Sequence, residues 1–427
     1  MVKTLAIVGG GPKAAAIVAR AAILRELLGK DRVPEIYVFE RNGVGAAWSG
    51  DYGFSSGFLT LCSPAEKDVG FPYIEKLGNT LSAEPIAPKL YARFSWSSFL
   101  VETGNYAEWV DRGRDHPSHK IWADYLRWVF IKADQAIVQG EVLDVTPQAT
   151  GGWHIRYNDE EGEDTTYADG VVLTGTGNAK PITNISSQVP AQRIFDSETF
   201  WSNRSEISKF NEIAVAGAGG AAGAIIAWLS NALSEREEAT VRSISPTGTL
   251  FARGDGYAER RWFSDPSDWR ELLLQDRRNL IERTEGGVIS LRNKSIIDRS
   301  RNIDFVRGRA TGINWDGSEL SIDVEYDGQS VASPKSDCFI NAIGFDPWSL
   351  LDIVSAPQVN ILRQHGSQDI RDRAAEQMLS DLSFTPSNKL GTGLHVPVLA
   401  ALARGPGMGT LGCLGLVASS ILDGYVS

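Results

Sequence analysis

Hydrophobic positions near the start of the chain form two short runs separated by a long segment of small and apolar residues. The runs cover residues 5–8 and 35–39, and the segment between them covers residues 14–28. Short continuous runs are typical of buried strands, whereas the longer segment favours a buried helix. The order strand, helix, strand predicts a βαβ unit with parallel strands.

The same order returns in the middle of the chain. Residues 213–216 form a short apolar run, residues 222–234 a helix-forming segment, and residues 240–245 a further strand. Because the pattern returns with the same glycine spacing before its helix, we interpret it as a duplicated function and not as a solenoid repeat.

Other stretches predict elements that surround these two units. Apolar or alternating runs predict strands at residues 136–145 and 152–157, with a polar hairpin at 158–162, and strand segments at 169–177 and 337–346. A second hairpin is expected at 310–327, with its turn at Asp316-Gly317. Residues 74–120 look irregular and partly helical, and 254–305 charged and mostly helical, a helical lid or subdomain.

An amphipathic helix is expected at residues 121–136, and another helix at 411–422. The inner side of the first carries an aromatic and aliphatic stripe, which we interpret as core: Trp122, Tyr125, Leu126, Trp128 and Val129.

The composition fits a globular protein of two or three domains. The chain has 427 residues, too many for one small core, and its charged and hydrophobic fractions of 22% and 42% are ordinary. The net charge of −11 argues against nucleic acid or an anionic membrane as the main partner, because both reward clustered lysine and arginine.

Cysteine use and the absence of long apolar runs indicate a cytoplasmic protein. The three cysteines are widely spaced, which predicts neither a disulfide framework nor a zinc site. The first residues enter a strand directly, without a secretion signal, and no run is long enough to span a membrane. His116 and His119 flank a proline and are interpreted as surface residues, so no metal site is expected.

The turn between the first strand and its helix has the spacing of a dinucleotide-binding loop. Gly9 permits a tight turn, Gly11 lets the backbone approach a diphosphate, and Ala14 is small enough for close packing of helix and strand. Pro12 and Lys13 lie in the same loop, at the positive end of the helix. Glu40 ends the second strand, where a carboxylate can accept hydrogen bonds from ribose hydroxyls.

The second unit carries the same spacing in Gly217, Gly219 and Ala222. Its following strand ends in Ser-Pro-Thr, and the absence of an acid there favours NADP over NAD, since an acid would repel a 2′-phosphate. Arg242 and Arg253 are the nearest candidate partners for that phosphate.

Further glycine-rich turns are expected to approach a nucleotide. These are the loop with Trp48, the turn with Gly175 and Gly177, the strand end with Gly344 and Phe345, and the loop with Gly407 and Met408. The last of these opens a helix, and such a site suits an anionic or carbonyl group such as the N1–C2=O edge of a flavin.

Two dinucleotide sites in one chain predict FAD at the first and NADPH at the second. The nicotinamide then delivers hydride to flavin N5. A disulfide reductase would need a pair of redox cysteines, and none is present. Reduced flavin can instead react with O2 to give a C4a-hydroperoxide, whose distal oxygen is attacked by a nucleophilic substrate. An NADPH oxidase or reductase, and an idle flavin-binding regulatory protein, remain alternatives.

The chain resembles the flavin-dependent N-hydroxylating monooxygenases of siderophore pathways, and in pattern the lysine N6-monooxygenases of mycobactin and nocobactin assembly. The resemblance covers nearly the whole chain. Its motifs are the glycine loops at 9–14 and 216–222, the loop at 63–73, the segments at 257–266 and 283–288, the strand at 337–345, and the closing segments at 394–397 and 405–407.

The resemblance implies FAD- and NADPH-dependent N-hydroxylation of the side-chain amine of L-lysine or L-ornithine by O2. It implies that Lys67 binds the substrate α-carboxylate. Arg260 stands where the family has a substrate-binding asparagine, and an arginine favours an extra anion, so N-hydroxylation of an acidic amino acid is an alternative. No general base is assigned.

The resemblance also implies the architecture, an α/β fold with two Rossmann-like domains and a small helical substrate region. The FAD-binding domain is expected to comprise residues 1–207 and 336–427. The NADPH-binding domain is expected at 208–335, with the helical substrate region at about 256–305. A homo-oligomer is typical of such relatives.

Overall fold

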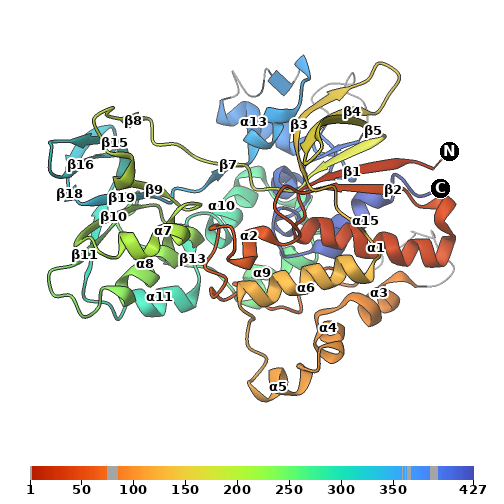
Figure 1. Cartoon of the computed structure of the whole chain (residues 1–427), viewed down its shortest axis with the longest axis horizontal. Coiled ribbons are helices and arrows are strands. Elements are labelled where there is room, and N and C mark those ends of the chain that lie inside the picture. Colours follow the sequence, from red (N-terminus) through yellow and green to blue (C-terminus); the bar gives the residue numbers. More distant parts are fainter. Residues whose placement is uncertain (1, 75–84, 358, 361, 363–366, 385–392) are drawn as a thin grey trace.

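The computed structural model shows two α/β lobes joined by extended segments (Figure 1). It describes residues 2–74, 85–357, 359–360, 362, 367–384 and 393–427.

The first lobe is built on a four-stranded parallel sheet in the order β2-β1-β6-β21. Strand β1 (Thr4–Val8) lies between β2 (Glu35–Phe39) and β6 (Gly170–Leu173), and β21 (Leu394–His395) closes the far edge. The predicted βαβ unit is therefore confirmed, and a strand from the C-terminal part of the chain completes its sheet.

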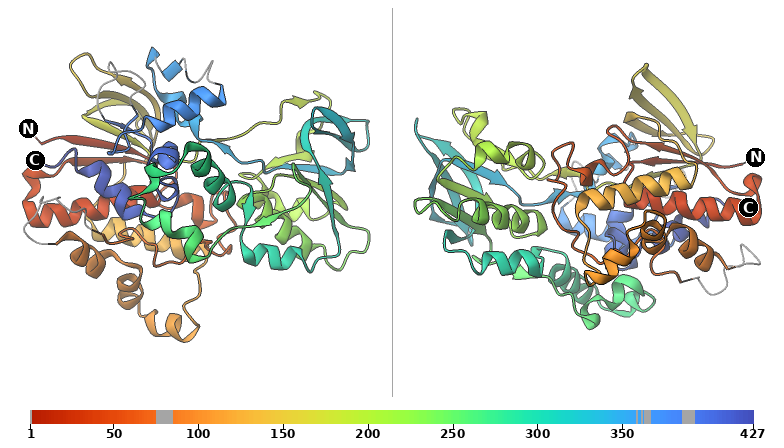
Figure 2. Two further views of the ribbon diagram at one scale, coloured as in Figure 1. Left: turned by 180° about the vertical axis from the view of Figure 1, so that it is seen from behind. Right: turned by 60° about the horizontal axis from the view of Figure 1, so that its bottom comes forward.

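Helix α1 (Pro12–Leu28) connects β1 to β2 and is buried on most of its surface. It packs against α15 (Leu414–Leu422), α3 (Ile86–Phe94) and α6 (His119–Lys132), which explains why its sequence shows no polar face. Figure 2 shows these helices grouped along α1.

The structure corrects the predicted end of the aromatic helix. Helix α6 ends at Lys132 and not at residue 136. Four members of its predicted stripe are fully buried and Trp128 is half-buried, which confirms the stripe as core. Two short helices, α4 (Trp96–Glu102) and α5 (Tyr106–Asp111), lie in the segment expected to be partly helical, of which residues 75–84 are outside the described part.

A small antiparallel sheet extends from the first lobe (Figure 1). It consists of β3 (Gly140–Pro147), β4 (Trp153–Asp159) and β5 (Gly162–Ala168). The prediction placed the start of the first strand too early and missed the third. Strand β5 was missed because its side chains are mostly polar and exposed, so its pairing with β4 carries little hydrophobic signal.

The second lobe contains a five-stranded parallel sheet in the order β14-β11-β10-β19-β9. Its centre is β10 (Glu212–Ala216), followed by α8 (Gly220–Ala232) and β11 (Thr240–Ser245), as the repeated pattern predicted. The remaining strands are β14 (Ile303–Arg307), β19 (Cys338–Asn341) and β9 (Ile194–Asp196), and α11 (Leu291–Ile297) packs beside α8.

A second, mostly antiparallel sheet packs on the face of the five-stranded sheet that lies opposite α8. Its hairpin pairs β15 (Arg309–Trp315) with β16 (Leu320–Tyr326), and the turn between them contains Asp316-Gly317 as predicted. The short strands β8 (Asn184–Ile185), β17 (Gln329–Ala332) and β18 (Lys335–Ser336) complete it.

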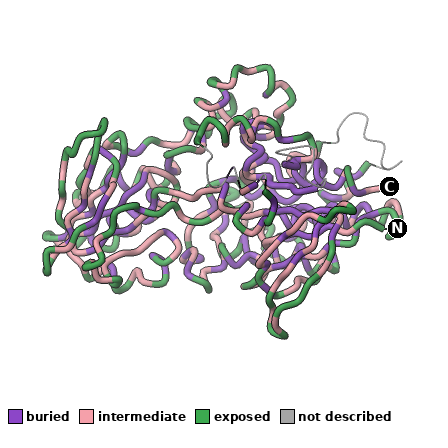
Figure 3. The backbone as a smooth tube through the Cα atoms, turned by 90° about the horizontal axis from the view of Figure 1, so that it is seen from above, coloured by how far each residue is buried: buried purple, intermediate pink, exposed green. Residues whose placement is uncertain are grey.

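The division between the lobes differs from the expected limits at residues 207 and 335. The core of the first lobe draws on residues 5–173 and 348–425, and the two cores of the second lobe draw on residues 182–342. Strands β9 and β19 both pair within the second sheet, so β19 does not return to the first lobe. Figure 3 shows the buried backbone concentrated inside each lobe.

Two extended segments connect the lobes. Strand β7 (Asn178–Ala179) pairs in antiparallel fashion with β20 (Phe345–Asp346), so the outward and return connections lie side by side (Figure 1). This pairing holds the two connections together where the chain passes between the lobes.

The predicted helical region is present, and it docks on the first lobe although its chain is inserted in the second. It comprises α9 (Tyr257–Ser264), the 3-10 turn η3 (Trp269–Glu271) and α10 (Leu274–Thr284). The Leu402 carbonyl accepts hydrogen bonds from Trp269 Nε1 at 3.0 Å and from Arg277 Nη1 at 2.7 Å. None of the helices that the structure describes combines the length and hydrophobicity needed to cross a bilayer.

Candidate functional site

The first glycine loop is a tight turn between β1 and α1. Gly9 has φ +104°, and a β-carbon there would lie 2.5 Å from Thr174 Oγ1. The Gly9 N–H donates to the Phe39 carbonyl at 2.8 Å, which fixes the turn to the end of β2. Glycine is therefore required at this position by the fold itself.

Gly11 has a different reason to lack a side chain. It precedes α1 with extended backbone, and no protein atom lies within 4 Å of the place where its β-carbon would be. Pro12 opens the helix, and Ala14 is fully buried. The free N–H groups and positive dipole end of α1 thus face open space that a diphosphate can fill.

Glu40 follows β2 and braces this loop. Its Oε2 accepts a hydrogen bond from the Gly10 N–H at 2.7 Å, and its Oε1 accepts one from the Asn42 N–H at 3.0 Å. Each oxygen keeps a further lone pair, which leaves the carboxylate able to accept from ribose hydroxyls as predicted.

The second glycine loop repeats this division of tasks. Gly217 has φ +137°, and a β-carbon there would meet the Ala342 carbonyl oxygen at 2.1 Å. Gly219 precedes α8 with extended backbone and open space around it. Ala222 is fully buried in the helix. The carboxyl end of β10 and the start of α8 therefore form a second open diphosphate site.

The loop that carries Lys67 is held by the neighbouring carboxylate. Asp68 is 2% exposed and accepts hydrogen bonds from Tyr73 Oη at 2.6 Å, the Trp96 N–H at 2.8 Å and the Gly70 N–H at 3.1 Å. Burial raises the pKa of Asp68 to about 7, against these hydrogen bonds, which lower it. The anchored loop fixes the backbone on which Lys67 stands.

Lys67 lies in a cluster of charges from the helical region. The two ion pairs of Arg260 Nη1 are with Glu285 Oε1 at 3.0 Å and Asp255 Oδ1 at 3.8 Å. The other oxygen of Glu285 pairs with Arg253 Nη2 at 3.3 Å. Burial, and then the charge of Arg260, lower the pKa of Lys67.

This cluster brings together three predicted residues, Lys67, Arg253 and Arg260. Arg260 is itself largely buried, with 11% of its side chain exposed. In the described part of the chain Lys67 has no ion pair, and its ammonium lies 5.4 Å from the centre of the Phe71 ring.

The closing segment packs tightly against the helical region. A β-carbon on Gly407 would lie 2.2 Å from the Phe263 carbonyl oxygen, so glycine is needed there for contact with α9. Met408 is buried, and its sulfur lies 3.8 Å from Cys413 Sγ at the start of α15. The predicted loop of Gly407 and Met408 thus joins α9 to α15.

The remaining predicted glycines lie where the two lobes meet. A β-carbon on Gly177 would lie 1.9 Å from the Asp346 carbonyl oxygen, and one on Gly175 would lie 3.0 Å from Leu350. Gly344 has φ +100°, and Phe345 begins β20. These residues shape the crossing of the connections.

Trp48 lies in the short helix α2 (Ala46–Ser49), half-buried and edge-on to the His119 ring at 4.7 Å between centres. His119 is not the plain surface residue that the sequence suggested. Its Nδ1 lies 2.8 Å from Ser55 Oγ, and burial lowers its pKa to about 4. The ring is therefore neutral at pH 7.

The comparisons with known proteins agree with this geometry. A family model described as L-lysine 6-monooxygenase/L-ornithine 5-monooxygenase matches residues 86–298. The L-lysine N6-monooxygenase MbtG of Mycobacterium tuberculosis is 34% identical over 98% of this chain and 94% of its own length. The chain belongs to the L-lysine 6-monooxygenase/L-ornithine 5-monooxygenase family.

Solved structures of this monooxygenase family support the fold. The lysine monooxygenase NbtG from Nocardia farcinica is 32% identical with a TM-score of 0.81, covering 98% of this chain and 100% of that one. The ornithine N-hydroxylase KtzI from Kutzneria sp. 744 is 18% identical with a TM-score of 0.73, covering 100% and 99%, and is similar in fold. The resemblance and the fold class expected from the sequence are confirmed.

The structure contradicts the prediction that Arg242 binds the 2′-phosphate of the second nucleotide. Arg242 forms ion pairs with Glu212 and, at 3.8 Å, with Asp304, and it donates to the Lys335 carbonyl at 2.7 Å. Glu212 begins β10, whereas the glycine loop follows the end of that strand. The side chain of Arg242 therefore points to the start of β10, away from the glycine loop at the end of that strand.

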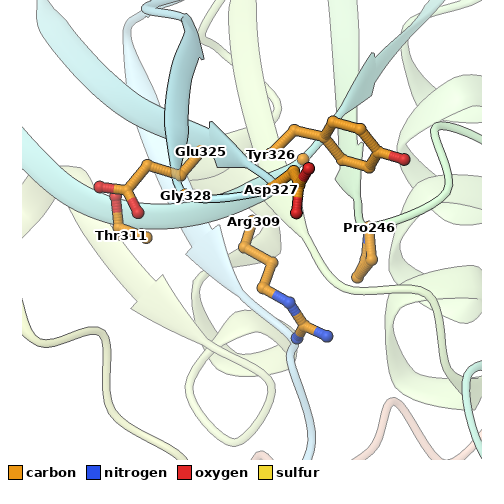
Figure 4. A pocket seen from close by; sticks show the side chains of 8 residues that line it. Pro246, Arg309, Thr311, Glu325, Tyr326, Asp327 and Gly328 are labelled. Atoms are coloured by element: carbon orange, nitrogen blue, oxygen red, sulfur yellow. The ribbon is translucent and has the colours of Figure 1, made fainter.

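A pocket of about 360 Å³ lies beside the carboxyl ends of β11 and β14. Figure 4 shows its lining, which includes Pro246, Arg309, Glu325 and Asp327. It contains no residue of either glycine loop. We therefore do not place a diphosphate in it.

Sequence reasoning missed several residues that build the site. Glu285 lies in the segment at 283–288 that carries the family resemblance but was given no role, and Asp255 lies outside every motif, five residues before its partner Arg260. Asp68, beside Lys67, was given no role from the sequence, although it is buried. In the part of the chain that the structure describes, no group of His, Cys, Asp and Glu could hold a metal ion.

Proposed function

We propose that this protein is an FAD- and NADPH-dependent monooxygenase that hydroxylates the side-chain amine of L-lysine, with L-ornithine as the alternative substrate, using O2. The observation that carries the proposal is the pairing of two open helix N-termini after Gly-x-Gly-x-x-Ala turns with a charged cluster around Lys67. Membership of the L-lysine and L-ornithine monooxygenase family supports it.

The first lobe fits FAD. A diphosphate fits the space that Gly11 leaves open at the start of α1, and Glu40 ends the neighbouring strand where a ribose would lie. We assign to FAD the residues predicted for the first site: Gly9, Gly11, Pro12, Lys13, Ala14, Glu40, Trp48, Gly175, Gly177, Gly344, Phe345, Gly407 and Met408. Bound FAD supplies the ring that accepts hydride and activates O2.

The second lobe fits NADPH, with its diphosphate at Gly217, Gly219 and Ala222. Arg253, which lies in the charged cluster around Lys67, is kept as a candidate contact of NADPH. For the 2′-phosphate we propose Arg307, which pairs in register with Ser245 at the end of β11, the strand end that meets the second ribose. Its guanidinium stacks on the Tyr326 ring at 3.9 Å.

The charges around Lys67 favour a substrate with one carboxylate over an acidic amino acid. Glu285 and Asp255 already neutralise the two arginines of the cluster, so Lys67 contributes the net positive charge. Arg260 then shapes the cluster and does not offer a second anion site. This leaves the α-carboxylate of a lysine or ornithine as the group for Lys67 to bind.

The chain contributes binding and exclusion of water to the reaction. The substrate amine must be neutral to attack an oxygen atom, and transfer into a buried site lowers the pKa of an amine. Lys67 would hold the far end of the substrate while the helical region covers the site. The described residues identify no general base.

The decisive experiment scores hydroxylamine formation with a panel of amino acids. L-Lysine should give hydroxylamine in proportion to NADPH consumed, L-ornithine less, and aspartate and glutamate none. Equal or greater product from an acidic amino acid would contradict the assignment. Norleucine, which has the α-carboxylate and α-amine of lysine but lacks its side-chain amine, is the matched control.

An NADPH oxidase that releases peroxide is the second candidate function. It predicts NADPH consumption with stoichiometric peroxide for every amino acid in the panel. A disulfide reductase is disfavoured because Cys62, Cys338 and Cys413 form no pair, the latter two being buried. Peroxide and hydroxylamine measured in the same reaction separate the two functions.

A further inference from the structure

Lys13 is a buried cation that no carboxylate of the described residues balances. It is the second residue of α1 and is 8% exposed. Its ammonium lies 3.4 Å from the Thr174 carbonyl oxygen, a long hydrogen bond, and in the described part of the chain it forms no ion pair. An ammonium group buried in this way destabilises a protein unless a ligand or counter-charge compensates it.

The start of α1 adds positive potential at Lys13, which lies in the first turn of that helix. Cys413, at the start of α15, lies near enough to favour the charged form of Lys13 if its thiol is ionised. Burial raises the pKa of the Cys413 thiol to about 12, so that thiol is neutral and offers no negative charge. Burial also lowers the pKa of Lys13 to about 8. The site is therefore complete only with an anion.

The direction of the side chain selects between two anionic parts of FAD. The diphosphate has the backbone N–H groups around Gly11. The Lys13 side chain instead reaches across to the end of β6, at Thr174, and towards the start of α15, at Cys413. The loop before α15 holds Gly407, the region suited to the flavin N1–C2=O edge.

We propose that Lys13 stabilises the negative charge that the flavin ring gains on reduction, and so sets how readily NADPH reduces it. The inference rests on the proposed function. Hydride leaves the nicotinamide as its C–H bond breaks, and NADP+ departs with the positive charge. The hydride adds to flavin N5, so the ring gains two electrons and one proton, and therefore one unit of negative charge, shared between N1 and C2=O. The Lys13 ammonium balances this charge.

The test compares Lys13→Met, Lys13→Arg and the exposed control Lys30→Met. FAD affinity is measured by reconstituting apoprotein, and the flavin midpoint potential by anaerobic dye equilibration. In Lys13→Met, oxidised FAD should bind within a few-fold of wild type, while reduced FAD binds roughly ten- to hundredfold more weakly. This lowers the midpoint potential by about 30–60 mV, since a tenfold change corresponds to 29.6 mV for two electrons. Lys13→Arg and Lys30→Met should keep the potential.

An unchanged potential in Lys13→Met overturns the proposal. Equal weakening of oxidised and reduced FAD also overturns it, because that result assigns Lys13 to the diphosphate. Sulfite binding to the wild-type flavin is a measurement that needs no variant. Sulfite adds to N5 and places the same negative charge on the ring, so its affinity should fall as pH rises through the pKa of Lys13. A flat profile across that range contradicts the proposal.

These readouts use the FAD-loaded protein without amino acid. A protein that cannot be loaded with FAD removes the proposed function, whereas a loaded protein with an unchanged potential in Lys13→Met removes only this inference.

Discussion

Lys67 and Arg260 show how the same kind of charge takes different roles in different surroundings. Arg260 is held by two carboxylates, whereas Lys67 forms no ion pair among the described residues and lies beside the Phe71 ring and the positive charge of Arg260. A cation in that position gains most from a ligand carboxylate. The binding role that the sequence suggested for both residues therefore falls on Lys67.

We expect Lys67→Ala to raise the KM for the amino acid roughly ten- to hundredfold, the loss of a charged hydrogen bond worth about 1.5–3 kcal/mol. Flavin reduction by NADPH should change little. Steady-state hydroxylamine kinetics and anaerobic stopped-flow reduction measure the two effects. An unchanged KM would show that Lys67 supports the loop only.

The pKa of Lys67 also predicts a pH dependence. Because burial and Arg260 lower this pKa from 10.5, Lys67 loses its charge at a lower pH than an ordinary lysine. The KM should therefore rise as pH rises through that pKa. Lys67→Arg keeps its charge in the alkaline range and should shift this rise to higher pH. If both proteins give the same profile, the titration belongs to the substrate.

Arg307 is the residue that should distinguish the two nicotinamide cofactors. Arg307→Ala should raise the KM for NADPH roughly tenfold and leave the KM for NADH unchanged, since only NADPH carries the 2′-phosphate. Flavin reduction rates over a range of each cofactor test this. Arg309→Ala, two residues further on, is the matched control, and an equal effect there would contradict a specific role for Arg307.

Among the elements, the two strand–turn–helix units separate glycines needed for folding from glycines needed for a ligand. A β-carbon at Gly9 or Gly217 would collide with Thr174 or with Ala342, at positive φ. A β-carbon at Gly11 or Gly219 meets no protein atom. Sequence spacing alone does not make this distinction.

Substitution of these glycines gives a paired prediction. Gly11→Ala should keep the apoprotein folded and remove FAD binding, whereas Gly219→Ala should keep a yellow, FAD-loaded protein that NADPH no longer reduces. Gly217→Ala should destabilise the second lobe, because its backbone cannot accommodate a side chain. Thermal unfolding, flavin content and NADPH titration test the three variants. FAD binding retained in Gly11→Ala would contradict the diphosphate site.

The strand–turn–helix elements were predictable because each is specified locally. The apolar runs before Gly9 and Gly217 and the helical segments after them fix direction and pairing within a short length of chain. Strand β5 and the end of α6 were not predictable in this way. The first is mostly polar and exposed, and the second depends on where the chain leaves the aromatic core.

At the scale of the whole molecule, the helical region ties the two lobes together. Its chain is inserted in the second lobe, yet Trp269 and Arg277 donate to Leu402 in the first. Arg277 Nη2 also pairs with Glu376 at 2.8 Å. The charged cluster around Lys67 forms only through this docking.

Two histidines of the first lobe, the half-buried His119 and the buried His395, predict that acid destabilises it. Burial lowers the pKa of His119 to about 4 and also lowers that of His395, whose Nε2 lies 2.8 Å from Tyr425 Oη. The unfolded chain binds these protons more tightly, so stability should fall as pH drops from about 6.5 to about 4. Urea unfolding across this range measures it, and His119→Gln should flatten the decline. An equally steep decline in that variant would exclude His119 as a cause.

The sequence by itself determined the two nucleotide units and the helix that follows each, because these depend on local hydrophobic runs and glycine spacing. The resemblance of motifs along nearly the whole chain indicated the family. Only the tertiary structure decided that β9 and β19 complete the second sheet and that Arg242 pairs with Glu212 at the start of β10. It alone joined Lys67 to Arg260 and Glu285, and left Lys13 buried without a counter-charge among the described residues. The reason is physical: pairing between distant strands, burial and ion pairs depend on segments far apart in the chain, and no local pattern records them.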